Sequence, residues 1–94
     1  MSQISRKIIF IDTNNFTTAA KFEANYAIAI ASADDIDCVL TDQWGTEFFV
    51  AKSGITDERW YPLCLNGQTI DGLKVKTWTN VEKVIIGIGR VINE

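Results

Sequence analysis

Clustered β-branched residues constrain the fold of this 94-residue chain more than any other feature of the sequence. The chain holds 13 isoleucines, 6 valines and 9 threonines, many of them in short runs such as residues 7–12, 36–41 and 46–52. Branching at Cβ restricts side-chain rotation in a helix and suits the pleated surface of a strand. A sheet is therefore expected to be the main element.

Two neighbouring runs predict a β-hairpin. Residues 36–41 and 46–52 form strand-like runs on either side of a loop at 42–45 that has a glycine near its end, as hairpin loops of this length often do. Phe48 and Phe49 are adjacent, so in a regular strand their side chains point to opposite faces. Both faces of this strand are then expected to need cover.

Two more segments are expected to be strands in the second half of the chain. Residues 60–65 form an apolar run that contains Pro62, and residues 73–79 form a further run. Proline cannot donate a hydrogen bond to a strand ladder, so the 60–65 strand is expected at a sheet edge. The dipeptides Asn66-Gly67 and Asp71-Gly72 between these runs are turn signals.

Residues 16–33 are the most ambiguous part of the sequence. Seven alanines in this segment raise its helix propensity, and its apolar residues recur at helical spacing. Residues 26–31, however, also alternate with period two, as a strand does. We expect a helix that begins near Phe16, and the alternative is a shorter helix followed by a strand from Tyr26.

Residues 81–92 also fit two structures. Residues 79–82 have the form of a helix capping box, and apolar residues follow at helical spacing. Against a helix, Gly87 and Gly89 would each cost about 1 kcal/mol, and the run is rich in β-branched residues. We favour a strand, because the two glycines would let it bend across a sheet.

These elements predict one compact domain spanning residues 1–94, since a chain of this length has no room for two. The expected fold class is α+β: a mainly antiparallel sheet of roughly 4–6 strands with one helix, at residues 16–33, packed on one face. The alternative is an all-β sandwich or a small barrel.

The chain contains no histidine, which limits its chemistry. This removes the most common general base, the usual partner of a serine or cysteine nucleophile, and the commonest zinc ligand. Cys38 and Cys64 alone cannot complete an ordinary structural zinc site within one chain. Residues 87–89 lack the third glycine of a dinucleotide-binding motif, and no phosphate-binding loop occurs. We expect no enzyme activity, no catalytic residue and no cofactor.

An acidic cluster at Asp34, Asp35 and Asp37 is the only candidate for a metal site. Hard cations take several oxygen ligands in one loop. A calcium-binding loop starting at Asp35 would need a glycine and a glutamate at the positions of Leu40 and Thr46. We expect a solvated turn and no metal, with weak Ca²⁺ or Mg²⁺ binding as the alternative.

The chain is mildly acidic, with a formal net charge of −3 and a pI of about 4.8. Its lysines and arginines are scattered rather than grouped, so a nucleic-acid partner is not expected. The apolar stretch near the N-terminus is too short for a signal peptide, and no run is long enough to span a membrane. We expect a cytoplasmic protein with Cys38 and Cys64 as free thiols, each buried within the apolar run that contains it.

Aromatic residues at exposed positions are the best candidates for a contact surface. Trp44 lies in the predicted hairpin loop, and Arg59, Trp60 and Tyr61 lie on the predicted edge strand. Tryptophan, tyrosine and arginine are enriched among the residues that dominate protein interfaces. We hypothesise that these four residues contact a protein, and the alternative is that Trp44 and Trp60 fold down over the sheet.

Three classes of function remain. The first is a non-enzymatic protein-interaction or assembly subunit, for instance a small structural component of a virus or phage particle, acting through a protein partner or self-association as a homo-oligomer. The second is a small acidic inhibitor that binds another macromolecule, such as a phage-encoded antagonist of host defence. The third is a domain that binds a small ligand. We favour the first, because the chain shows exposed aromatic candidates and no catalytic constellation.

Overall fold

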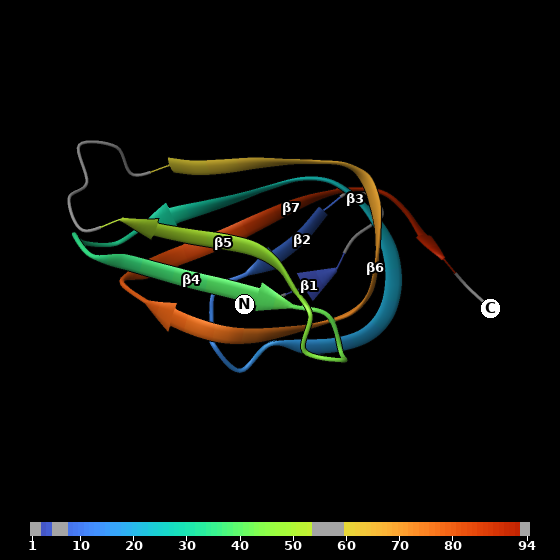
Figure 1. The fold of residues 1–94 in the computed structure, drawn as a ribbon, viewed down its shortest axis with the longest axis horizontal. Helices are drawn as coiled ribbons and strands as arrows, with labels where there is room; N and C mark the ends of the chain where they lie inside the picture. The colour runs from blue at the N-terminus through green and yellow to red at the C-terminus, as the bar shows by residue number, and fades with distance from the viewer. Residues whose placement is uncertain (1–2, 5–7, 54–59, 93–94) are drawn as a thin grey trace.

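A computed structural model describes residues 3–4, 8–53 and 60–92, which form a single antiparallel sheet (Figure 1). The strands are β1 (Gln3–Ile4), β2 (Ile8–Ile11), β3 (Thr17–Ala31), β4 (Ile36–Thr41), β5 (Glu47–Ser53), β6 (Trp60–Thr79) and β7 (Val81–Ile92). The described residues contain no helix, and so none that could cross a membrane. The predicted α+β class, with a helix on one face of the sheet, is wrong, and the fold is all-β.

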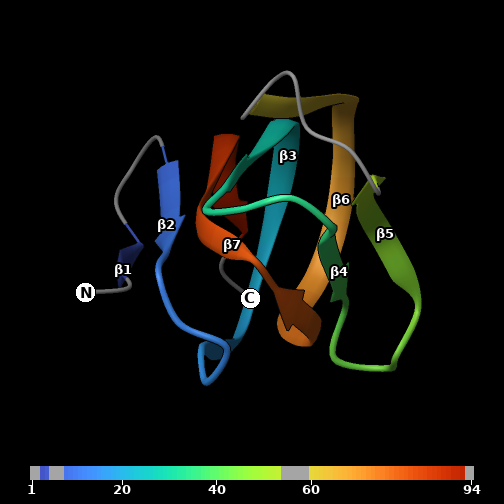
Figure 2. The same ribbon diagram turned by 90° about the vertical axis from the view of Figure 1, so that its left-hand side faces the viewer.

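The seven strands are ordered β1-β2-β7-β3-β6-β4-β5 across the sheet. The two longest, β3 and β6, bend so strongly that the sheet folds over on itself (Figures 1 and 2). The first layer holds β1, β2, β7 and the parts of β3 and β6 that pair around Tyr26 and Cys64. The second layer holds the other ends of β3 and β6, joined through Lys74–Thr79 to β4 and then β5.

Residues 16–33 do not form the predicted helix. The segment becomes β3, which is hydrogen-bonded to β6 on one side and to β7 on the other. Alanine propensity is a weak preference, and pairing on both sides with burial of one face outweighs it. The structure follows the period-two alternation from Tyr26 onward, the pattern that supported the alternative of a strand beginning there.

The bend in the sheet is built from irregular strand pairing. In the pairing of β3 with β6, Asn25 stands opposite three residues, 65–67. Asn66 and Gly67 in this bulge have φ angles of 53° and 77°, a region that glycine and asparagine enter more readily than other residues. Asn66-Gly67 is therefore a bulge inside a long strand, not the turn that its sequence suggested. Asp71-Gly72 lies near a second irregularity of the same pairing.

Residues 81–92 form a strand, as the sequence analysis favoured. β7 follows β6 through a single residue, Asn80, whose φ is 55°. The Asn80 side chain donates hydrogen bonds from Nδ2 to the carbonyl oxygens of Asp34 and Asp35, at 2.7 and 3.2 Å. The apparent capping box at 79–82 is thus a tight strand connection that also fastens the loop between β3 and β4.

The core lies between the two layers and receives side chains from six strands. Its buried members are Ile9, Ile11, Phe22, Ala24, Ala27, Ala29, Ala31, Ile36, Cys38, Leu40, Phe49, Ala51, Leu65, Ile70, Leu73, Val81, Val84, Ile86 and Ile88. Pro62 lies in the part of β6 that has a registered partner on only one side among the described residues, because pairing with β4 begins at Lys74. The predicted edge position of Pro62 is confirmed.

Phe48 and Phe49 both pack against this core, although they are adjacent in sequence. The register of β5 with β4 slips between Leu40 and Thr41, which leaves Phe48 in a bulge and lets both rings turn inward. The expectation that these two residues require cover on opposite faces of the strand is therefore wrong.

Candidate protein-contact site

The β4–β5 loop is closed by hydrogen bonds at its base. The Asp42 amide donates to the Thr46 carbonyl at 2.9 Å, and the Gly45 amide donates to the Asp42 carbonyl at 3.2 Å. Gly45 has a φ of 90°, which a side chain would strain. The loop is the hairpin connection that the sequence predicted.

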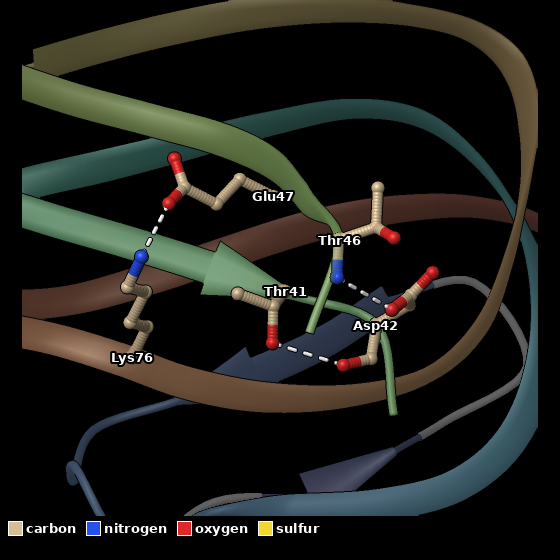
Figure 3. Close-up of polar contacts among 5 residues, drawn as sticks. All are labelled: Thr41, Asp42, Thr46, Glu47 and Lys76. Carbon is tan, nitrogen blue, oxygen red and sulfur yellow. Dashed lines mark hydrogen bonds and ion pairs between the residues drawn. The ribbon is translucent and has the colours of Figure 1, made fainter. Parts of the chain in front are cut away.

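The Asp42 carboxylate organises the backbone of this loop. Its Oδ1 atom accepts hydrogen bonds from the amides of Trp44 and Thr46, both at 2.9 Å. The buried Thr41 hydroxyl donates to the Asp42 carbonyl oxygen at 2.9 Å (Figure 3). Short aspartate side chains stabilise turns in this way, because they replace backbone partners that the turn leaves unpaired. The loop is therefore ordered before any partner arrives.

A second carboxylate, that of Asp71 on β6, holds the tip of the loop. Asp71 Oδ2 accepts a hydrogen bond from Trp44 Nε1 at 3.2 Å, and its Oδ1 accepts one from Gln43 Nε2 at 2.9 Å. The Gln43 amide also donates to the Asp71 carbonyl oxygen at 3.0 Å. These three bonds fix the loop to the neighbouring strand and hold the indole by its only polar atom.

Trp44 is nonetheless 74% exposed, the most exposed large hydrophobic residue among those described. Its Nε1 is satisfied by Asp71, so the rest of the ring meets water without compensating polar contacts. The alternative that Trp44 folds down over the sheet does not hold. The arrangement presents a large apolar group in a fixed direction. A side chain that is already fixed loses little conformational entropy when a protein binds it.

An ion pair lies beside this loop in the second layer. Lys76 on β6 and Glu47 on β5 pair at 2.5 Å across the end of the intervening strand β4 (Figure 3). Lys76 lies where the register of β6 with β4 slips, which releases its side chain from the regular alternation. The pair is exposed, so its net contribution to stability is small, on the order of 0–1 kcal/mol.

The other predicted contact residues lie elsewhere. Trp60 and Tyr61 are the first residues of β6, in the first layer, whereas the Trp44 loop meets β6 beyond the bend at Asp71 (Figure 1). Arg59 lies outside the described residues. The structure therefore does not join Trp44 with Trp60 and Tyr61 in one patch.

Sequence reasoning found Trp44 but missed the residues that hold it. The sequence marks Gln43 only as part of a loop and Asp71 only as part of a turn dipeptide. Their contacts join positions 28 and 27 residues apart, so no local pattern reveals them. The only local indication is that the loop at 42–45 and the dipeptide Asp71-Gly72 each contain an aspartate and a glycine, residues that favour turns.

The acidic cluster and the two cysteines show no arrangement for chemistry. The carbonyl oxygens of Asp34 and Asp35 accept the Asn80 side chain, and no three metal-binding side chains gather in the part of the chain that the structure describes. Cys38 is buried in the core, as expected, but Cys64 is exposed, contrary to the expectation of a buried thiol. Both thiols are free.

Comparison with known proteins gives little guidance. No protein-family model matches the chain, and no curated protein sequence matches it. A solved structure of a fucose binding module from Streptococcus pneumoniae is similar, with a TM-score of 0.44 and 11% sequence identity, over 88% of this chain and 70% of that chain. A likeness this distant carries no conclusion about the present chain.

Proposed function

We propose that the protein is a non-enzymatic protein-interaction or assembly subunit and that Trp44 is the centre of one contact surface. The observation that carries the proposal is the exposed indole on a loop that Asp42 and Asp71 hold in place. A loop ordered in advance gives up little conformational freedom on binding, so more of the burial energy appears as affinity.

The size of the group supports this role. An indole of this exposure offers about 150 Å² for burial, which is worth roughly 3–4 kcal/mol. That energy corresponds to a change of about two to three orders of magnitude in Kd. A single substitution at Trp44 is therefore expected to be measurable against any contact made by this surface.

The test compares two substitutions at exposed apolar residues. Trp44→Ala removes the proposed contact, and Val50→Ala is the matched control, because Val50 is 52% exposed on the neighbouring strand β5. Proteins captured by the tagged chain from the cells that make it are identified by mass spectrometry. Each candidate is then purified, and its Kd for the three forms is measured directly.

The expected result is a purified partner whose Kd rises at least a hundredfold with Trp44→Ala and less than threefold with Val50→Ala, while both variants keep the wild-type unfolding midpoint. A Trp44→Ala variant that binds the same partners with unchanged Kd would overturn the proposal. Equal losses in both variants would also overturn it, because they would show that the contact is not centred on Trp44.

A further inference from the structure

Asn66-Gly67 and Asp71-Gly72 are the two places in the chain where a side-chain carbonyl group comes directly before a glycine. In such a dipeptide the glycine nitrogen can attack the side-chain carbonyl carbon, Cγ, because the glycine has no Cβ to obstruct the approach. The product is a cyclic succinimide. The backbone and the side chain must rotate towards each other to react, so the surroundings of each dipeptide decide whether the ring forms.

Asn66-Gly67 lies in a stretch of β6 that the register of the sheet does not hold. Both residues are exposed, and both belong to the bulge at 65–67, which has no registered partners on β3. Pairing of β6 with β4 begins only at Lys74, so no described strand is registered with them on the other side. A local rotation at this point breaks no registered strand pair, and it is therefore easier here than within a paired strand.

The surroundings of Gly67 also leave room for the reaction. Apart from the adjacent residues, a Cβ atom added at Gly67 would have one neighbour within 4 Å, Asn25 Oδ1 at 3.9 Å. The Gly67 nitrogen can therefore turn towards the Asn66 side chain without displacing packed atoms.

The thiol of Cys64 contacts the atom on which negative charge develops. Cys64 Sγ donates a hydrogen bond to Asn66 Oδ1 at 2.9 Å. When the Gly67 nitrogen bonds to Cγ, the carbonyl electron pair moves to Oδ1, which is an oxyanion until ammonia leaves. A donor that is already in place at this oxygen stabilises the intermediate. One hydrogen bond from an uncharged donor corresponds to an acceleration of about two- to tenfold.

Asp71-Gly72 has the opposite surroundings. Gly72 is buried, and a Cβ atom there would stand 2.8 Å from Gln43 Cβ and 3.1 Å from the Thr18 carbonyl oxygen. The Asp71 carboxylate accepts two side-chain hydrogen bonds from the β4–β5 loop, and the Asp71 backbone carbonyl accepts the Gln43 amide. These contacts hold both reacting groups in place, so the fold blocks the same chemistry at this dipeptide.

We infer that Asn66 is a site of spontaneous covalent modification in the folded protein. The Gly67 nitrogen forms a bond to Asn66 Cγ, the Cγ–Nδ2 bond breaks, and the Gly67 amide proton leaves with the side-chain nitrogen as ammonia. Water then opens the ring at one of its two carbonyl carbons, which leaves either aspartate or isoaspartate. The formal net charge of −3 becomes −4, since a carboxylate replaces a neutral amide. The site is separate from Trp44 and goes beyond the function proposed above.

The two products differ in their effect on β6. Aspartate keeps the length of the main chain and, like asparagine, enters the left-handed region in which Asn66 lies, with a φ of 53°. Isoaspartate adds one carbon to the main chain inside the bulge. The pairs Tyr26–Cys64 and Ile28–Pro62, which lie on one side of the bulge, must then shift relative to those on the other side. The isoaspartate form is therefore expected to unfold at a lower urea concentration than Asn66→Asp.

The test incubates the full chain in neutral buffer made with water that carries heavy oxygen. Peptides are then separated by chromatography, which resolves aspartate from isoaspartate, and are quantified by mass spectrometry. The label marks oxygen taken up during the incubation, so reaction during digestion is not counted. Asn80 is the matched control within the chain, because Val81 follows it and two hydrogen bonds hold its side-chain nitrogen. Cys64→Ala removes the thiol donor, and Cys64→Ser restores a donor at the same position.

The expected result for the folded chain is conversion of Asn66 while Asn80 and Asp71 stay unchanged. Cys64→Ala is expected to slow the conversion about two- to tenfold, and Cys64→Ser to restore most of the rate. In urea, Asp71-Gly72 is expected to react as well, because the contacts that hold it are lost.

An Asn66 that converts in urea but not in the folded chain would overturn the inference, because the bulge would then protect the dipeptide. Equal rates in wild type and Cys64→Ala would overturn the role given to the thiol. Binding through Trp44 is measured on freshly prepared protein, so the failure of either proposal leaves the other standing.

Discussion

At the scale of single residues, Cys38 is the group whose chemistry the fold changes most. Its side chain is fully buried in the core. Burial, together with a smaller effect of the neighbouring Asp37 carboxylate, raises the pKa of the Cys38 thiol from 9.0 to about 12. The thiolate is the reactive form, so Cys38 is inert while the protein is folded, and the exposed Cys64 is the thiol that reagents reach.

The raised pKa of Cys38 predicts a loss of stability in alkali. Below 9.0 the thiol is protonated in both states, and between 9.0 and about 12 only the unfolded chain loses its proton. The free energy of unfolding of the wild type is expected to fall, relative to Cys38→Ala, by about 1.4 kcal/mol per pH unit in that window. Urea denaturation of both proteins at a series of pH values measures the difference, and parallel curves would contradict the prediction.

At the scale of elements, Asn80 joins three parts of the chain. It connects β6 to β7 with a left-handed backbone, and its side chain binds the carbonyls of Asp34 and Asp35. Its own carbonyl oxygen also accepts the Ser32 amide at 2.9 Å. One residue thus fixes the connection between β6 and β7, which do not pair with each other, and the loop that joins β3 to β4.

Replacing Asn80 is expected to separate its two roles. Asn80→Ala removes the side-chain hydrogen bonds, at about 1 kcal/mol each, and adds about 1 kcal/mol of backbone strain, a total near 2–3 kcal/mol. Asn80→Gly loses the same bonds without the strain, so it is expected to be about 1 kcal/mol more stable than Asn80→Ala. Urea denaturation checks this order, and an alanine variant as stable as the glycine variant would refute the backbone contribution.

The sequence predicts strands correctly where the local pattern of residues matches the environment that the strand has in the folded sheet. The hairpin at 36–52, the strand at 81–92 and the edge position of Pro62 all follow from alternation, β-branching or a missing donor. Residues 16–33 resemble a helix because alanine, a good helix former, also fits the inner face of the bent strand β3, where Ala24, Ala27, Ala29 and Ala31 are buried. No local pattern indicates that two distant strands will pair with this segment.

The bend and the contact site share a further limit on prediction. Asn66-Gly67 has the composition of a turn, and only the continuing pairing of β6 with β3 on both sides makes it a bulge. Trp44 was identified from its loop, but its fixed orientation depends on Asp71, which arrives from β6. In both cases the missing information is the register between segments far apart in the chain.

At the scale of the whole molecule, the order of strands makes folding depend on distant contacts. β2 pairs with β7, near the opposite end of the chain, and the first layer cannot close before that pairing forms. Of the connections that the structure describes, only the one between β4 and β5 joins two strands that pair with each other. The chain must lose the entropy of closing these long loops before the burial of side chains between the paired strands can stabilise them.

This topology predicts slow folding for a chain of this size. Refolding is expected on the timescale of about milliseconds to seconds, as for other all-β domains dominated by distant pairings. Stopped-flow dilution from urea, followed by fluorescence of the half-buried Trp78, measures the rate. Refolding within microseconds would contradict the role given to the β2–β7 pairing.

The exposed indole of Trp44 also makes the molecule its own optical probe. A ring that is 74% in water emits at long wavelength and is open to collisional quenchers, so any partner that covers the loop shifts its emission to the blue. The difference spectrum between wild type and Trp44→Phe isolates this signal from Trp60 and Trp78. Binding at the β4–β5 loop can thus be followed without attaching a dye.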